Sequence, residues 1–165
     1  MTKESFLLEE LLREEEELQF VSFTNETALD IGLAIVQRAQ AAGHAVTIDI
    51  RRGGQQLFHY ACSGTSADND DWAARKARVV ERFQRSSYYL QVELQAAGRT
   101  IADRYLLDPT QYAPYNGAFP IRVRGAGMIG TIAVSGLAGD LDHLLITAAL
   151  RDYLHAKGSL IEDTV

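Results

Sequence analysis

Cysteine is almost absent from this sequence, which contains Cys62 as its one example in 165 residues. A single cysteine excludes an internal disulfide and a thiolate-rich metal site. Glu4, Glu9 and Glu10 interrupt the stretch in which a secretory signal would need an unbroken apolar run, so we expect no export signal. No apolar run approaches the roughly 20 residues of a membrane helix. These absences predict a cytoplasmic protein that does not cross a membrane.

Positive charge is also scarce. The chain has 16 Lys and Arg against 22 Asp and Glu, which gives a formal net charge of −6. Proteins that bind nucleic acids need positive charge facing the phosphates, so this balance argues against such a partner. The length suits one domain with a substantial core, and no linker or internal repeat divides it. We therefore expect a single domain over residues 1–165.

Apolar residues at helical spacing predict helices in several segments. Residues 4–18 form an amphipathic pattern in which leucines alternate with the acidic run from Glu14 to Glu17. A second helix is expected to begin at Thr24 or Asn25, either of which can cap it, and to stop at Gly43. The remaining helices are expected at about 70–84, 87–97 and 140–156. Residues 100–116 give no clear pattern.

Alternating residues predict two β-hairpins. Val46, Ile48 and Ile50 alternate with polar residues, and a Gly-Gly turn at 53–54 leads into a returning strand at 55–62. A second hairpin is expected from strands at 119–124 and 128–135. The last strand is apolar on both faces, which is typical of the centre of a sheet covered by helices front and back. The predicted fold class is α+β, with three α/β/α layers around a mostly antiparallel sheet.

Two familiar motifs do not carry their usual function here. The string from Gly125 to Gly130 fits G-x-G-x-x-G, but a strand follows it where a dinucleotide site needs a helix N-terminus. Ser135, Asp142 and His143 have the residue types of a hydrolase triad. Neighbouring helical residues point about 100° apart, so Asp142 is poorly placed to orient His143. The histidines of the last helix also lack the spacing of a metal pair, and we expect no metal site.

His59 is a candidate ligand-binding residue. If the turn at 53–54 has two residues, His59 faces Ile48 and shares an apolar face of the sheet with it. An imidazole in an apolar row must find a hydrogen-bond partner or a ligand. It could therefore be a core histidine with a satisfied hydrogen bond, or a ligand to a bound group.

Lys76 is a second candidate because it lies within an apolar stripe. On a helical wheel it falls between Val79, Val80 and Phe83. A lysine in that position either extends its ammonium outward to water or points it into a pocket. The sequence leaves both alternatives open.

Several strings resemble a known family. They are Asp49-Ile-Arg-Arg-Gly-Gly-Gln-Gln-Leu-Phe-His-Tyr-Ala61, Gly64-Thr-Ser-Ala-Asp-Asn-Asp-Asp-Trp72, Arg75-Lys76, Phe119-Pro-Ile121, Gly130-Thr-Ile-Ala-Val-Ser-Gly136 and Asp142-His143. Together they resemble the bacterial and fungal UPF proteins with a haem-degrading domain, distant relatives of the GlcG-like family. The resemblance covers nearly the whole chain.

The resemblance implies a profilin-like fold with a five-stranded antiparallel sheet between helices, assembled as dimers or larger homo-oligomers. Some distant relatives bind haem or are linked to its degradation, and others accompany corrinoid or glycolate metabolism. Fold is transferred by such a resemblance better than function. It names neither the ligand of this chain nor a reaction.

Two hypotheses about function follow. In the first, the protein binds a small molecule, with haem or a related anionic cofactor as the leading class. Arginines would pair with carboxylates, a histidine would ligate iron, and Lys76 would add charge to the pocket. In the second, it is a non-enzymatic homo-oligomer that binds protein through the helix at 4–18. The candidate ligand-binding residues are Arg51, Arg52, His59, Lys76, Asp142 and His143.

Overall fold

The computed structural model describes residues 1–158 and contains one sheet of four antiparallel strands. The strand order is β2-β1-β4-β3. None of the helices within these residues is long and apolar enough to cross a membrane. The strands are β1 (Thr47–Arg52), β2 (Gln55–Ala61), β3 (Ala118–Val123) and β4 (Gly127–Ser135).

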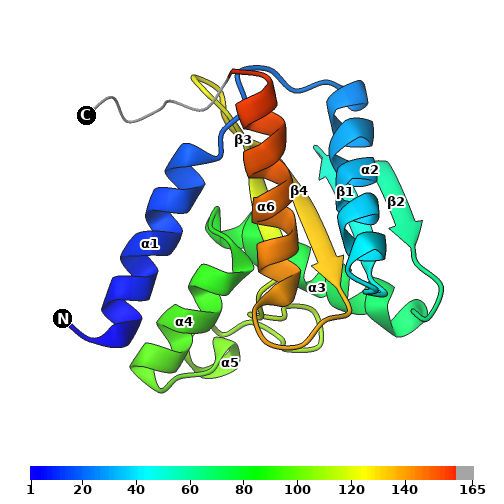
Figure 1. Cartoon of the computed structure of the whole chain (residues 1–165). Coiled ribbons are helices and arrows are strands. Elements are labelled where there is room, and N and C mark those ends of the chain that lie inside the picture. The colour runs from blue at the N-terminus through cyan, green and yellow to red at the C-terminus, as the bar shows by residue number, and fades with distance from the viewer. Residues whose placement is uncertain (159–165) are drawn as a thin grey trace.

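Six helices surround the sheet among the described residues. Figure 1 shows α1 at one edge of the molecule beside α4, while α2, α3 and α6 pack on the strands. The helices are α1 (Lys3–Glu17), α2 (Asn25–Ala41), α3 (Ala67–Phe83), α4 (Ser87–Ala97), α5 (Ile101–Tyr105) and α6 (Leu141–Ala156).

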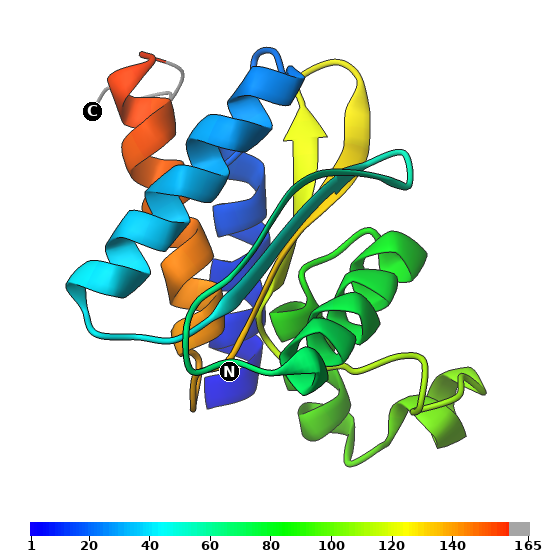
Figure 2. The same cartoon turned by 90° about the vertical axis from the view of Figure 1, so that its right-hand side faces the viewer.

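The three predicted layers are present. Figure 2 shows α2 and α6 on one side of the sheet and α3 with α4 on the other. The largest apolar cluster lies beneath α2 and α6, where Ile48, Ile132 and Ile146 have no exposed surface. The α3 side is packed with small residues, among them Ala77 and Ala133, so α3 lies close to the strands. Polar side chains on this side of the sheet therefore lie near the helix.

The central position of β4 follows from its composition, as predicted. It pairs with β1 along one edge and with β3 along the other. Residues 131–135 are all buried, because α3 covers one face of the strand and α6 the other. The observed helix bounds also agree closely with the sequence, including the capping box of Thr24 at the start of α2.

The expected number of strands is not confirmed, since the described residues contain four rather than five. Phe20 makes a single parallel bridge to Val123 at the position beside β3 where a fifth strand would lie. Its N–H donates to Arg122 and its carbonyl accepts from Arg124. The chain leaves this edge at once to begin α2, so the pairing does not extend. Residues 100–116, which show no clear pattern in the sequence, contain the short helix α5 and loops.

The register of the first hairpin differs from the prediction. A β-bulge interrupts the pairing after Ile50, so Ile50 lies opposite Phe58, and Asp49 opposite His59. A shift of one residue moves every side chain of a strand to the other face. His59 consequently lies on the polar, α3-facing side of the sheet, and its expected place in an apolar row is wrong.

Gly32 of α2 lies against the Phe58 ring of β2, and its lack of a side chain leaves room for that ring on the apolar face of the sheet. A Cβ atom on Gly32 would lie 2.4 Å from the Phe58 ring. We predict that Gly32→Ala lowers the free energy of unfolding by about 1–3 kcal/mol through overpacking, although alanine favours helices. Urea denaturation measures the change. The double variant with Phe58→Leu should recover stability, and an unchanged or more stable Gly32→Ala protein would contradict the packing.

Candidate functional site: two pockets around Trp72

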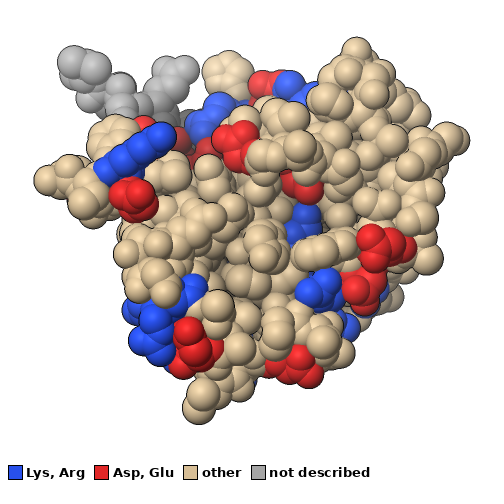
Figure 3. All heavy atoms as spheres, turned by 90° about the horizontal axis from the view of Figure 1, so that it is seen from below, with Lys and Arg blue, Asp and Glu red and all other residues tan. Residues whose placement is uncertain are grey.

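Two adjoining pockets open at the end of the molecule where β4 runs into α6. They share three residues, Trp72 of α3, Gln91 of α4 and the loop residue Tyr115. Figure 3 views this end, where most of the surface is uncharged and acidic and basic groups lie next to one another in small clusters. We call the two pockets together the Trp72 cleft.

The first part of the cleft, the polar pocket, has a volume of 530 Å³. Its floor is formed where the start of α3 meets the end of β4 and the first turn of α6. Besides the shared residues, it is lined by Asp68, Asn69, Lys76, Asn116, Ser135, Gly136, Leu137, Gly139 and Asp142.

Lys76 points into this part of the molecule and is 3% exposed. Its ammonium lies 3.1 Å from an Asp142 carboxylate oxygen, and it donates to the carbonyls of Asn116 at 3.0 Å and Val134 at 2.5 Å. An ammonium has three N–H donors, so all three are used. Of the two alternatives left open by the sequence, the inward one holds, but Lys76 keeps no donor for a ligand.

Burial affects both members of this pair. It lowers the pKa of the Lys76 ammonium and raises the pKa of the Asp142 carboxyl, and in each case the charge of the partner opposes the shift. Asp142 also accepts a hydrogen bond from the Leu137 N–H at 3.0 Å. Fully satisfied donors and acceptors of this kind stabilise a buried charged pair.

The second part of the cleft, the aromatic pocket, has a volume of 560 Å³. Arg75 and Arg99 supply its charge, and Arg99 is paired with Asp103 at 2.8 Å. None of the described residues that line the pocket is acidic. The Arg75 guanidinium lies over the Trp72 ring, 4.4 Å from the centroid. Apart from the shared and charged residues, the pocket is lined by Leu94, Gln95, Thr100, Ile101, Ala102, Pro109, Tyr112 and Pro114.

His143 follows Asp142 in the sequence but faces a different pocket. It is 1% exposed, and its Nε2 lies 2.6 Å from a Glu14 carboxylate oxygen on α1. Tyr88 covers the ring edge to face at 5.0 Å. The hydrolase triad is therefore not assembled. Ser135 and Asp142 line the cleft, whereas His143 contacts Glu14 of α1 and lines a separate pocket of 310 Å³.

His59 and Arg51 meet at Asp49, away from the cleft. The two nitrogens of His59 lie 3.2 Å from Asp49 and 2.9 Å from Asp70, in the first turn of α3. Arg51 donates to Asp49 through Nε at 2.7 Å. Arg52 instead donates to Asn25 at the start of α2. Of the six predicted site residues, only Lys76 and Asp142 line the Trp72 cleft.

The sequence reasoning missed Trp72, Arg75 and Tyr115 as site residues. Trp72 is the single tryptophan of the chain, and it follows a polar loop beside a stripe of arginines. A large aromatic residue at the exposed start of a helix was an available signal. Tyr115 gave none, because it lies in the segment without a clear pattern.

Comparisons with known proteins agree on the family. The model of the family described as "Haem degrading protein HbpS-like" matches residues 23–151. A UPF0303 protein of Streptomyces avermitilis is 46% identical over 145 residues, which cover 88% of this chain and 89% of the relative. The chain belongs to the HbpS-like family. The resemblance seen in its sequence is thus confirmed.

Solved structures similar to this HbpS-like chain support the fold. The crystal structure of the Ybr137w protein superposes with a TM-score of 0.85 at 29% identity, covering 91% of this chain and 88% of that one. The structure of a PduOC–haem complex has a TM-score of 0.65 at 18% identity, covering 80% and 94%. The second likeness concerns the fold alone.

The Lys76–Asp142 pair yields a prediction about stability. Lys76→Met leaves the Asp142 carboxylate buried without its partner, and we expect a loss of about 3–5 kcal/mol in the free energy of unfolding. The double variant Lys76→Met/Asp142→Asn removes the unpaired charge and should recover part of the loss. Denaturant unfolding monitored by circular dichroism compares the two. A single variant no less stable than the double would contradict a charged pair.

Proposed function

We propose that this chain binds a small organic molecule in the Trp72 cleft. The observation that carries the proposal is the union of two pockets of 530 and 560 Å³ through three shared residues. Ligand pockets typically measure about 300–1,000 Å³ and combine apolar walls with a few polar groups. The aromatic pocket supplies the walls, and the polar pocket supplies hydroxyl and amide groups.

Family membership makes haem the first candidate ligand. The family description names a haem-degrading protein, and one structural neighbour was solved as a haem complex. Haem is a flat dianion, which suits a cleft with aromatic walls and two arginines. This support comes from relatives, so the residues of this chain must be tested against the group.

The residues of the cleft do not fit haem iron held by histidine. Among the described residues that line the cleft, none is His, Cys or Met. Both nitrogens of His59 contact carboxylates elsewhere, and His143 is buried beneath α1. Tyr112 and Tyr115 are the lining residues whose side chains could ligate iron, as tyrosine does in some haem proteins. Arg75 and Arg99 are the arginines that line the cleft and would pair there with the haem carboxylates; Arg51 and Arg52 do not line it.

A titration with tetrapyrroles tests this reading. Because Trp72 is the single tryptophan, its fluorescence reports on the cleft directly. We expect both haemin and metal-free protoporphyrin IX to quench it, and any tighter binding of haemin to be independent of histidine, since no histidine is among the described residues that line the cleft. His59→Ala, with its Soret band recorded in parallel, should behave as the wild type. Haemin binding that is tenfold tighter than protoporphyrin IX binding and is lost in His59→Ala would place the ligand outside the cleft.

A homo-oligomeric interaction module is a second candidate, and exposed apolar residues favour it. Phe6 of α1 is 53% exposed, and Leu141 and Leu144 are also exposed at the start of α6. α1 is itself packed against the domain, because Leu11 and Glu15 are buried and Glu14 contacts His143. Deleting α1 would therefore disturb the fold as well as any interface. A substitution on its exposed face is the sharper test.

We predict that Phe6→Glu lowers the oligomer mass measured by sedimentation velocity, since a charge in an apolar interface is costly. Leu33→Glu is the matched control, because Leu33 is 45% exposed on α2, on a different surface. A monomeric wild type, or an oligomer weakened only by Leu33→Glu, would contradict an interface through α1.

A further inference from the structure

We infer that the ligand of the Trp72 cleft is a small aromatic carboxylate, whose ring lies in the aromatic pocket and whose carboxylate pairs with Arg75. The inference rests on the proposed function and adds the chemical class of the ligand and its orientation. It assigns the anion to a residue that was not among the six predicted site residues.

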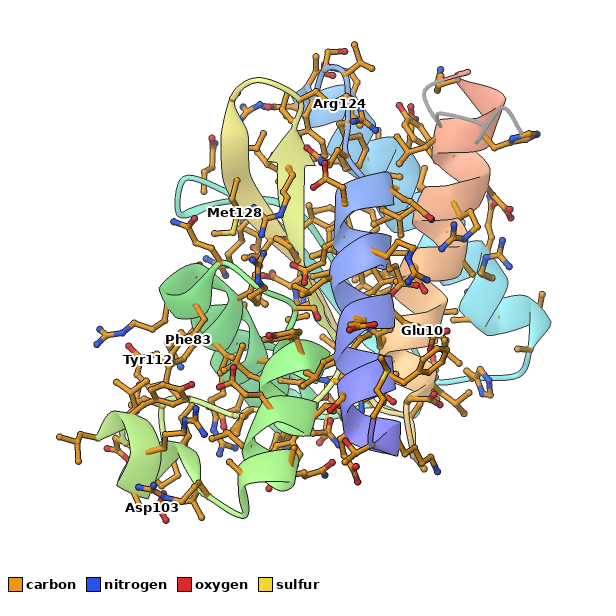
Figure 4. The ribbon with its side chains drawn as sticks, turned by 90° about the vertical axis from the view of Figure 1, so that its left-hand side faces the viewer. Glu10, Phe83, Asp103, Tyr112, Arg124 and Met128 are labelled. Atoms are coloured by element: carbon orange, nitrogen blue, oxygen red, sulfur yellow. The ribbon has the colours of Figure 1, made fainter. Side chains whose placement is uncertain are left out.

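The walls of the aromatic pocket favour a flat ring. Trp72 and Tyr115 meet edge to face, with centroids 5.8 Å apart and an interplanar angle of 74°. Figure 4 shows Tyr112 and Phe83 close together near α5, and both rings pack against the apolar cluster that includes Leu94. These contacts fix the position of the Tyr112 ring in the pocket wall. Aromatic rings pack favourably against one another in offset and edge-to-face geometries.

Arg75 has unused hydrogen-bonding capacity in this pocket. One terminal nitrogen donates to the Pro109 carbonyl at 2.6 Å, and the other lies 3.8 Å from Asp71. Its Nε has no hydrogen-bond partner in the part of the chain described, but protein atoms cover it, so a ligand in the pocket does not reach it. A guanidinium has five N–H donors in a rigid fork that matches a carboxylate. A ligand carboxylate would accept hydrogen bonds from the N–H groups of the two terminal nitrogens that the described residues leave unused.

The charges of the two pockets set the orientation. Arg75 and Arg99 are the charged residues lining the aromatic pocket. Asp68 and Asp142 line the polar pocket, and the donors of Lys76 are already taken. An anion placed in the polar pocket would face carboxylates without a free donor from Lys76. The carboxylate of the ligand therefore belongs beside Arg75, and an uncharged polar group suits Ser135 and Gln91.

Matched probes test the class of ligand. 2-Naphthoate and 2-naphthamide share a ring system and differ in charge, and isothermal titration calorimetry gives the Kd of each. We expect wild-type protein to bind the carboxylate about tenfold or more tightly than the amide, as a charge-assisted hydrogen bond provides. Arg75→Gln should reduce this preference to less than about threefold.

Arg78→Gln is the control variant. Arg78 lies on the same helix and likewise donates to a loop carbonyl, that of Gln111 at 3.2 Å, but it does not line the cleft. The Arg78→Gln protein should keep the full preference for the carboxylate over the amide. Equal melting temperatures of Arg75→Gln and Arg78→Gln would show that the reduced carboxylate preference of Arg75→Gln does not come from the loss of an arginine–loop hydrogen bond.

The outcomes separate this inference from the proposed function. Equal wild-type affinity for both probes, lost in Trp72→Leu, would overturn the aromatic carboxylate and leave the cleft as a binding site. Naphthoate binding that is undiminished in Trp72→Leu would overturn both, because the ligand would then lie elsewhere. Absence of binding by either probe would overturn the inference even if Arg75→Gln failed to fold.

Discussion

The buried pair of Lys76 and Asp142 is the interaction on which this end of the molecule depends. The lysine ammonium joins α3 to the carbonyls of Asn116 and Val134 and to a carboxylate in the first turn of α6. An unpaired charge at this depth would cost several kcal/mol, so the segments that supply its partners must stay together. Gly117 reflects the same constraint, because a Cβ there would lie 2.4 Å from the lysine nitrogen. The pair therefore positions the cleft without offering a donor to a ligand.

Trp72 lies between two kinds of surface in the cleft. On one side lie the polar groups at the end of β4, and on the other an aromatic pocket whose lining, within residues 1–158, includes two arginines and no acidic residue. A buried network with every donor satisfied is rigid. Arg75 differs, because its two terminal nitrogens make one hydrogen bond to the described residues, at Pro109, while its guanidinium lies over Trp72. The cleft thus combines a rigid, saturated floor with one cation that can still bind an anion.

The sequence predicted the architecture well and the site only partly. Helical and strand periodicity located the helices and placed β4 at the centre of the sheet, because burial on two faces leaves a direct pattern in the residues. Lys76 was recognisable from its position in an apolar stripe. His59 was assigned to the wrong face, since a bulge at Ile50 changes the register and leaves no signal in an otherwise regular alternation. The fifth strand was expected from the family and is reduced here to one bridge at Phe20.

What the sequence by itself determined is the family, the class of fold and the burial of particular residues. Each of these follows from local periodicity or from strings of neighbouring residues. Only the tertiary structure decided which side chains share a site. Asp142 and His143 are adjacent in sequence but face different pockets, because successive helical residues point in different directions. Trp72 and Tyr115 lie far apart in sequence yet touch, because contacts between α3 and the loop before β3 depend on how the whole chain packs.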